Sequence, residues 1–449
     1  MKNKCVNNHS AWAYVIGLYF PFGIMQGMQA MFPTSLFKLL GFSNQTVGLI
    51  SGLGLIAIIR FLYTPWLDGA ASKRTLSFWT LILGSIVLLS IGALVYIQLD
   101  PAKFVIAMIP LLLLMIIIGS AHETAADGYY IRALNAKQQA QFIGIKTAVI
   151  RIGLVSVHMG LMLGATKVAA HYGAFGVICS DKTGFYIGYA AAYVVAAVLV
   201  LFFLFWNRAM MPVLANDEPV SHTQFAIGEV FKEYFNQRSV FLIIAVIFLY
   251  RIGDGFLAAM KVPFYLDPDS AGGLGVAATT IPYYSLLTDM PWMIIGGVLG
   301  GYVIKWRGIK KTFLPLACCI SLPNISYILL AIYRPGINVQ MFGESMNLWL
   351  LGGSCLESLG YGLAFSGVFY YMHITATESG RNKTSILAIS FALMNAGWYL
   401  PGMLSGFVQA KVGYVGVFTI SCLAGWIVLF IIPHVPEPLS ERCGRDKAA

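Results

Sequence analysis

Long apolar stretches separated by short polar ones run along almost the whole chain. A helix that crosses the hydrocarbon core of a membrane needs about 20 mostly apolar residues. Twelve stretches meet this requirement, at 12–36, 46–66, 75–97, 104–126, 141–165, 184–206, 239–261, 277–304, 312–333, 346–372, 384–410 and 414–433. The pattern predicts an all-α polytopic membrane protein with 12 transmembrane helices.

The longest polar interruption lies between the sixth and the seventh apolar stretch. It covers about residues 207–238 and contains Asp217, Glu218, Glu229, Lys232 and Glu233. Polar segments of this kind separate domains. We therefore expect an N-terminal six-helix bundle over residues 1–206, a cytoplasmic linker over 207–238, and a C-terminal six-helix bundle with a short cytoplasmic tail over 239–449.

The composition excludes an ordinary soluble protein. Of the 449 residues, 58% are hydrophobic and only 11% are charged, whereas an average soluble domain is about 25% charged. The same hydrophobicity excludes a disordered chain. The net charge of +10 is the excess that basic loops on one side of a membrane produce, so we expect no nucleic-acid partner.

Lys and Arg residues are unevenly distributed between the two sets of loops. With both termini inside, the cytoplasmic segments hold 18 of them and the opposite side holds seven, Lys261 among the seven. Four more fall within the spans: Arg60, Lys146, Arg151 and Arg251. Because cytoplasmic loops carry an excess of positive charge, the asymmetry predicts a multi-pass protein with both termini in the cytoplasm.

No motif indicates a metal or another cofactor. The seven cysteines form no CxxC pair, and most lie in apolar runs or near the termini, where they act as small packing residues. Glu123 and Asp127 are spaced for acid–base catalysis or metal binding, but no third ligand or nucleophile accompanies them. We expect no cofactor and no enzymatic activity.

Four charged residues lie near the middle of predicted spans in the C-terminal half. Arg251 and Asp254 share one helix face at a spacing of three residues, and Asp289 and Glu357 lie at similar depth in two other spans. Charges inside a membrane are costly and mark functional sites by default. A structural network is one interpretation, and a substrate and proton-coupling site is the other, in which separating an acid from its cation allows it to bind a proton.

A second charged group lies at the cytoplasmic end of the fourth span. Glu123 and Asp127 are four residues apart, hence on one helix face, and Arg60 lies two turns before Asp68 in the second span. One hypothesis is a cytoplasmic gate in which the acids pair with Arg60 or with basic residues of adjacent loops. The alternative is a solvated helix end.

Polar side chains on two further spans complete the candidate site. Arg151 and His158 are two turns apart on one face of the fifth span, and His158 could carry a proton or serve only in packing. Gln26 and Gln29 share a face of the first span. They could hydrogen-bond a sugar or an amide, or join helices to each other.

The two halves of the chain repeat one feature. Leu67-Asp68-Gly69 and Lys73-Arg74 follow the second span, and Gly300-Gly301-Tyr302 with Lys305 and Arg307 follow the eighth. Together with the six-plus-six arrangement, these basic, glycine-containing turns resemble the major facilitator superfamily, whose loop between helices two and three has a Gly/Asp/basic signature. The resemblance implies two six-helix bundles that rock around a central site at mid-membrane depth.

Four internal segments match a narrower pattern. They read RFLYTPWLD at 60–68, HETAADGY at 122–129, LYRIGDGF at 249–256 and ESLGYG at 357–362. These resemble the KFLWAPLMD, QDIxxDA, LYKLGDAF and ENLxxGxG segments of the AmpG-type muropeptide permeases. Arg251 takes the place of the family's Lys in the third segment, and Asp254 carries over unchanged.

This resemblance implies a proton-motive-force-dependent importer in a bacterial inner membrane. The cargo of the family is an anhydro-muropeptide, a sugar–peptide fragment recovered in peptidoglycan recycling. We therefore expect a monomer in the lipid bilayer that couples a muropeptide-like solute to protons by alternating access. The family also includes acetyl-CoA transporters and importers found near siderophore genes, so a carrier of the same fold for another solute is the alternative.

Overall fold

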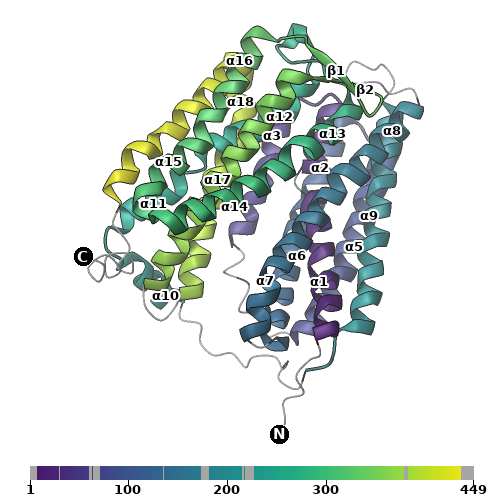
Figure 1. The fold of residues 1–449 in the computed structure, drawn as a ribbon. Helices are drawn as coiled ribbons and strands as arrows, with labels where there is room; N and C mark the ends of the chain where they lie inside the picture. The colour runs from purple at the N-terminus through teal and green to yellow at the C-terminus, as the bar shows by residue number, and fades with distance from the viewer. Residues whose placement is uncertain are drawn as a thin grey trace. The chain divides into compact units, whose positions relative to one another are not determined.

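The computed structural model describes residues 8–29, 31–59, 63, 71–134, 136–172, 182–214, 217, 227–378 and 383–435. Within them all regular secondary structure is helical apart from one β-hairpin (Figure 1). Residue contacts divide the chain into two compact units. Unit 1 comprises Met1–Leu40 and Ile59–Phe225, and unit 2 comprises Gly41–Ile58 and Ala226–Ala449.

Unit 1 is built from long, mostly apolar helices. They are α1 (Asn8–Gln29), α2 (Met31–Leu39), α5 (Lys73–Ile97), α6 (Pro101–Ala133), α7 (Ala136–Ser156), α8 (Leu163–His171) and α9 (Thr183–Met210). A π-helical segment, Val157–Met162, joins α7 to α8.

Unit 2 holds the helices α3 (Asn44–Gly52), α10 (Ile227–Phe235), α11 (Val240–Leu249), α12 (Ile252–Leu266), α13 (Ile281–Tyr284), α14 (Met290–Arg307), α15 (Ile309–Ser321), α16 (Ile325–Tyr333), α17 (Leu348–Glu378) and α18 (Lys383–Ile431). Strands β1 (Asn338–Met341) and β2 (Glu344–Asn347) form the hairpin.

Nine helical stretches in the described residues are long and apolar enough to cross a membrane. One of them holds two of the predicted spans, because the backbone of α18 turns at Gly413 (φ 70°, ψ −176°). Two more predicted spans match α17 and the short apolar stretch Asn44–Ile59. Every apolar stretch singled out in the sequence therefore overlaps a helix, and the all-α polytopic prediction is confirmed.

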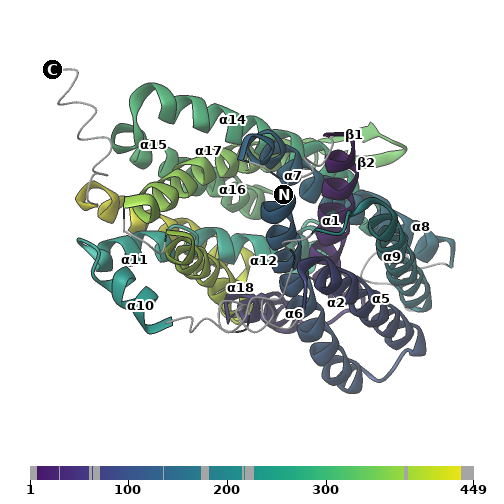
Figure 2. The same cartoon turned by 90° about the horizontal axis from the view of Figure 1, so that it is seen from below.

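Glycines allow close packing in both units. In unit 1, a Cβ at Gly23 of α1 would lie 2.3 Å from the carbonyl oxygen of Ile150 in α7. In unit 2, a Cβ at Gly255 of α12 would lie 2.3 Å from the carbonyl oxygen of Trp398 in α18. Small residues let membrane helices approach closely enough for van der Waals packing to hold them together. Elsewhere in unit 1, α5 and α9 lie side by side in both views (Figures 1 and 2).

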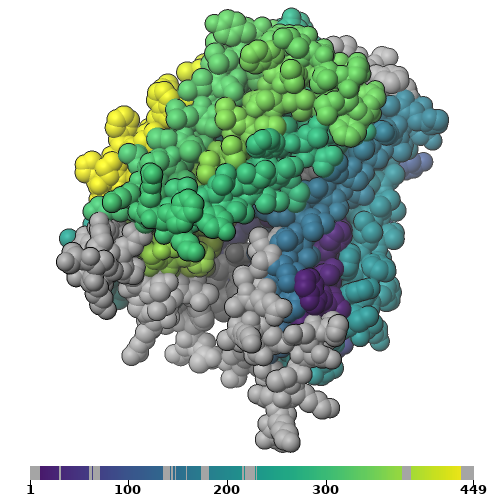
Figure 3. All heavy atoms as spheres, viewed as in Figure 1, coloured from purple at the N-terminus to yellow at the C-terminus, as the bar shows by residue number. Residues whose placement is uncertain are grey.

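The outward side of α14 is strongly apolar. Ile294, Val298 and Trp306 are 52%, 55% and 77% exposed, and Figure 3 shows α14 at the surface of unit 2. An exposed apolar helix face of this kind is expected where a helix contacts lipid.

Asp217, a residue of the predicted linker, forms hydrogen bonds and an ion pair with unit 1. Its two carboxylate oxygens accept hydrogen bonds from the backbone N–H groups of Lys73 and Arg74 at 2.8 and 2.9 Å, and Arg132 pairs with it at 2.8 Å. The first N–H groups of a helix have no partner within the helix, and a carboxylate there also interacts favourably with the helix dipole. Asp217 therefore caps α5 and joins it to α6.

The hairpin is a local feature that the apolar pattern did not indicate. Its strands pair in register from Asn338 with Asn347 to Met341 with Glu344. Phe342 and Gly343 connect them, and both have positive φ angles (56° and 79°), as tight hairpin turns require.

Candidate functional site

Arg251 and Asp254 form a buried ion pair. The helix breaks between α11 and α12 at Arg251, and Asp254 lies in the first turn of α12. The Nη2 and Nε atoms of Arg251 donate to one oxygen of Asp254 at 2.7 and 3.3 Å. Only 5% of Arg251 and 7% of Asp254 are exposed. The spacing of three residues therefore brings the two charges together, as we expected.

Aromatic rings surround the guanidinium group of Arg251. Its Nη2 donates to the hydroxyl of Tyr361 at 3.1 Å. The guanidinium carbon lies 5.5 Å from the ring centre of Tyr361 and 5.0 Å from those of Phe365 and Trp398. Cations bind the faces of such rings more strongly where water is excluded. The cation at the break between α11 and α12 is thus held by side chains of α17 and α18.

A second charged cluster has Lys261 at its centre. Its Nζ atom lies 2.9 Å from Asp289 Oδ1 and 2.9 Å from Glu357 Oε2. The side chains of Lys261, Asp289 and Glu357 are 17%, 36% and 13% exposed. One ammonium group is therefore shared by two carboxylates from different elements, and the three ionised groups together carry one net negative charge.

Lys261 was missed as a site residue, because the sequence suggested a loop position on the non-cytoplasmic side. The predicted span ended at residue 261, but α12 continues to Leu266. The apolar stretch Val240–Leu266 therefore contains Lys261. The sequence did contain a signal that Lys261 lies within a span. Lys261 follows Arg251 by ten residues, and both lie in one continuous apolar stretch.

Hydroxyl groups extend the polar region around Lys261. Thr288 donates to Asp289 at 3.1 Å. The hydroxyls of Tyr265, Tyr327 and Ser354 lie 2.9–3.1 Å from one another. Tyr265 lies four residues after Lys261, one turn further along α12. The interior of unit 2 thus offers hydrogen-bonding groups next to the charges.

In unit 1, Asp127 pairs with a lysine of a neighbouring helix. Lys146 Nζ of α7 lies 2.5 Å from Asp127 Oδ1, and the hydroxyl of Tyr19 donates to the same oxygen at 2.6 Å. Lys146 also lies 4.8 Å from the ring centre of Tyr19. Lys146 was counted within a span but was not connected with Asp127, because the sequence alone does not indicate which helices are neighbours.

His122 fills a structural position between three helices. It is fully buried, and its Nε2 atom donates to the carbonyl oxygen of Leu18 in α1 at 2.9 Å. Its Nδ1 atom lies 2.8 Å from the hydroxyl of Thr80 in α5. The neighbouring Glu123 is half-buried. Within this segment, His122 therefore joins helices.

The remaining predicted site residues are more dispersed. Arg151 and Gln29 are half-buried, whereas Gln26 is exposed. His158 belongs to the π-helical segment, but its side chain lies outside the described residues, as do Arg60 and Asp68. Among the residues that the structure describes, no three His, Cys, Asp or Glu side chains are grouped to hold a metal ion.

Solved structures with the same arrangement of helices show to which fold class the chain belongs. A bacterial homologue of the human lysosomal transporter Spinster matches with a TM-score of 0.66 at 11% identity, over 95% of both chains. The xylose transporter XylE from Escherichia coli matches with a TM-score of 0.62 at 14% identity, over 95% of this chain and 96% of that one. The chain is therefore an all-helical membrane protein with the fold of the major facilitator superfamily.

The sequence relatives are more specific, although distant. The putative transporter AmpG 1 of Rickettsia bellii is 22% identical over 414 residues, which cover 88% of this chain and 91% of the relative. The anhydromuropeptide permease of Escherichia coli is 21% identical over 405 residues, which cover 88% of this chain and 74% of the permease. No family model matches the chain. The resemblance to the AmpG-type permeases thus extends over most of the sequence, and these relatives are transporters, not enzymes.

Proposed function

We propose that this protein is a secondary transporter that imports a muropeptide-like solute across a bacterial inner membrane, driven by protons. The major facilitator fold and the distant permease relatives support transport by alternating access. The observation that carries the proposal is the cluster of Lys261, Asp289 and Glu357, three ionisable groups within membrane helices of unit 2.

The charge balance of this cluster suits proton coupling. Lys261 neutralises one of the two carboxylates, and the second carboxylate leaves an unbalanced charge within membrane helices. A bound proton neutralises that charge without breaking the contacts of Lys261. Asp289 is the more exposed of the two acids, at 36%, so it is the one from which a proton exchanges with water. Glu357 stays paired with Lys261.

The ion pair of Arg251 and Asp254 suits solute binding. Arg251 presents a planar group that can bind a carboxylate with two hydrogen bonds, and peptide stems of muropeptides carry carboxylates. Tyr361, Phe365 and Trp398 provide faces against which a sugar ring can pack. In this scheme the carboxylate of the solute competes with Asp254 for Arg251.

The remaining assignments complete the scheme. We place the boundaries of the two six-helix bundles at residues 1–206 and 239–449, with both termini in the cytoplasm. Arg151, His158, Gln26 and Gln29 contribute from the N-terminal bundle to solute or proton binding. Glu123, Asp127, Arg60 and Asp68 form the cytoplasmic gate, in which the pair of Asp127 and Lys146 breaks as the gate opens.

Uptake by proteoliposomes tests the proposal. The purified chain is reconstituted and supplied with labelled N-acetylglucosaminyl-anhydro-muramyl peptide, with and without an imposed proton gradient. We expect accumulation that depends on the gradient and is abolished by a protonophore. Uptake no greater than that of protein-free liposomes would reject the muropeptide. Acetyl-CoA and an iron-free siderophore, tested in the same way, separate the alternative carriers of the same fold.

A further inference from the structure

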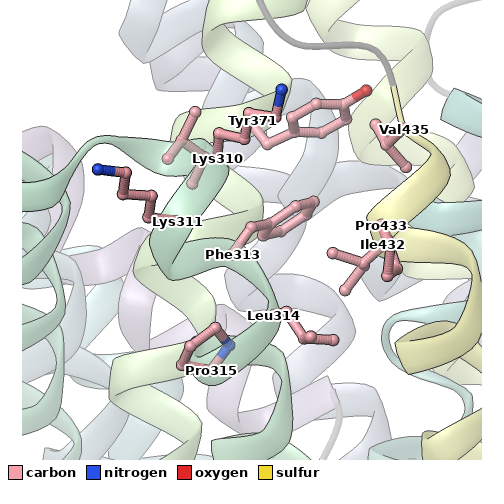
Figure 4. A pocket seen from close by; sticks show the side chains of 10 residues that line it. Lys310, Lys311, Phe313, Leu314, Pro315, Tyr371, Ile432, Pro433 and Val435 are labelled. Carbon is pink, nitrogen blue, oxygen red and sulfur yellow. The ribbon is translucent and has the colours of Figure 1, made fainter.

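A cavity of about 420 Å³ lies in unit 2 where α15 begins and α18 ends. Its walls include Lys310, Phe313 and Leu314 of α15, Tyr371 of α17, and Ile432 and Val435 after α18. Figure 4 shows the ring of Phe313 in the middle of this wall, with Lys310 reaching toward Tyr371. The volume is within the range of small-molecule sites, about 300–1,000 Å³.

Aromatic side chains indicate that the end of α14 next to the cavity lies at the membrane surface. Tyr302 and Trp306, in the last turns of α14, are 51% and 77% exposed, and their ring centres lie 6.1 Å apart. Trp and Tyr gather at the level of the lipid headgroups. The cavity begins only a few residues further along the chain, so it lies at headgroup depth.

Apart from its two lysines, the cavity is lined by apolar and aromatic side chains, and it adjoins exposed apolar side chains. Phe313 stacks on Tyr371 at a centroid distance of 5.0 Å, and Tyr250 also stacks on Phe313, at 5.8 Å. Leu314 is 36% exposed, and Phe430, one residue before the end of α18, is 78% exposed. An apolar ligand segment can therefore continue from the cavity along the lipid-facing surface.

The rim of the cavity is basic. Lys310 and Lys311 line it, Lys305 and Arg307 precede them within a stretch of seven residues, and the sequence contains no Asp or Glu between Asp289 and Glu344. All four cations are exposed. Figure 4 shows that Lys310 reaches over the cavity, whereas Lys311 extends from another side of α15. Basic pockets of membrane helices bind the headgroups of anionic lipids.

We propose that this cavity binds an anionic phospholipid, with the phosphate at Lys310 and one acyl chain along Phe313 and Leu314. The combination of a basic rim, an apolar wall and a position at headgroup depth matches a lipid, which has its charge and its hydrocarbon chains at opposite ends. A free phosphate ion would use only the rim and would leave the apolar wall without a ligand. In the topology proposed above, the lipid belongs to the cytoplasmic leaflet.

Native mass spectrometry of the full chain in detergent tests the site. Phosphatidylglycerol and phosphatidylcholine with the same acyl chains are titrated separately, and inorganic phosphate is titrated as a third probe. We expect one phosphatidylglycerol to bind at least tenfold more tightly than phosphatidylcholine. A lysine near an anionic surface contributes about fivefold to affinity, so Lys310→Gln with Lys311→Gln should weaken phosphatidylglycerol binding about 10- to 30-fold.

Two further variants separate the lipid site from general charge attraction. Leu314→Trp fills the apolar part of the cavity and should weaken binding without any change of charge. Lys103→Gln with Lys411→Gln removes the same charge outside the cavity, from two exposed sites, and should leave binding unchanged.

Three outcomes would overturn the proposal. The first is equal affinity for the two lipids. The second is an equal loss of phosphatidylglycerol affinity in the cavity variants and in the control variant. The third is that inorganic phosphate displaces phosphatidylglycerol while Leu314→Trp binds phosphatidylglycerol as tightly as the parent. The last result would identify an anion site in place of a lipid site. If the double lysine variant fails to elute as a single species, Lys310→Gln alone and Leu314→Trp decide the question.

Discussion

Replacing Lys261 with methionine keeps the length of the side chain and removes its charge. The Nζ atom lies 2.9 Å from each of two carboxylates, so Lys261→Met leaves Asp289 and Glu357 facing each other with no cation between them. The ionised cluster then changes from one net negative charge to two. We expect the variant to be less stable than the parent protein and to lose proton coupling.

The structure sets the size of the effect on stability. Removing one partner of a buried ion pair costs about 3–5 kcal/mol, and the 36% exposure of Asp289 favours the lower end because water screens its charge. A loss of 1 kcal/mol lowers the melting temperature of a unit of 150–250 residues by about 2–4 °C. We therefore expect Lys261→Met to melt about 6–12 °C below the parent protein in detergent.

Two controls make this measurement decisive. The triple variant Lys261→Met, Asp289→Asn and Glu357→Gln removes all three charges and should recover at least half of the loss, because neutral groups avoid the repulsion. Lys103→Met breaks a pair with Asp100 in which the two side chains are 73% and 76% exposed, and it should change the melting temperature by less than about 2 °C. The reasoning is refuted if Lys261→Met melts like the parent or if the triple variant melts no higher than Lys261→Met.

Further substitutions test the other contacts. Arg251→Gln with Asp254→Asn removes both charges of the buried pair and should reduce solute uptake at least tenfold while protein yield is kept, since no cation then remains to bind a carboxylate of the solute; undiminished uptake would contradict the proposed role. Asp217→Ala should lower the melting temperature by about 2–6 °C through loss of the cap on α5, and an unchanged value would show that the cap is dispensable. Gly255→Val should give aggregated protein in size-exclusion chromatography, because its Cβ would lie 2.3 Å from a carbonyl oxygen. The matched change Gly301→Val, where nothing lies within 4 Å of the added Cβ, should elute normally.

The fold was predictable because membrane helices have a strong and simple signal. About 20 apolar residues suffice to identify a span, and each of the stretches found in the sequence overlaps a helix of the structure. The hairpin at Asn338–Asn347 was missed because its strands have only four residues each. Their turn at Phe342-Gly343 lacks the Asn-Gly or Asp-Gly pair that marks the commonest hairpins.

The charged clusters were predictable only where the partners are close in the sequence. The pairing of Arg251 with Asp254 follows from their spacing on one helix turn. The pairing of Lys261 with Asp289 and Glu357 spans up to 96 residues, and it depends on which helices are neighbours and where α12 ends. Sequence reasoning identified the two acids but grouped them with Arg251 and Asp254, because Lys261, the last residue of the predicted span, was counted with the non-cytoplasmic loops.

The central claim is that the Lys261 cluster couples protons to transport. The most direct test compares proteoliposomes containing the parent protein, Asp289→Asn and Glu357→Gln, each with labelled muropeptide under an imposed proton gradient. The account predicts that the parent accumulates the solute against its gradient, whereas each variant loses accumulation but still exchanges internal for external solute. Full proton-driven accumulation by both variants would contradict it.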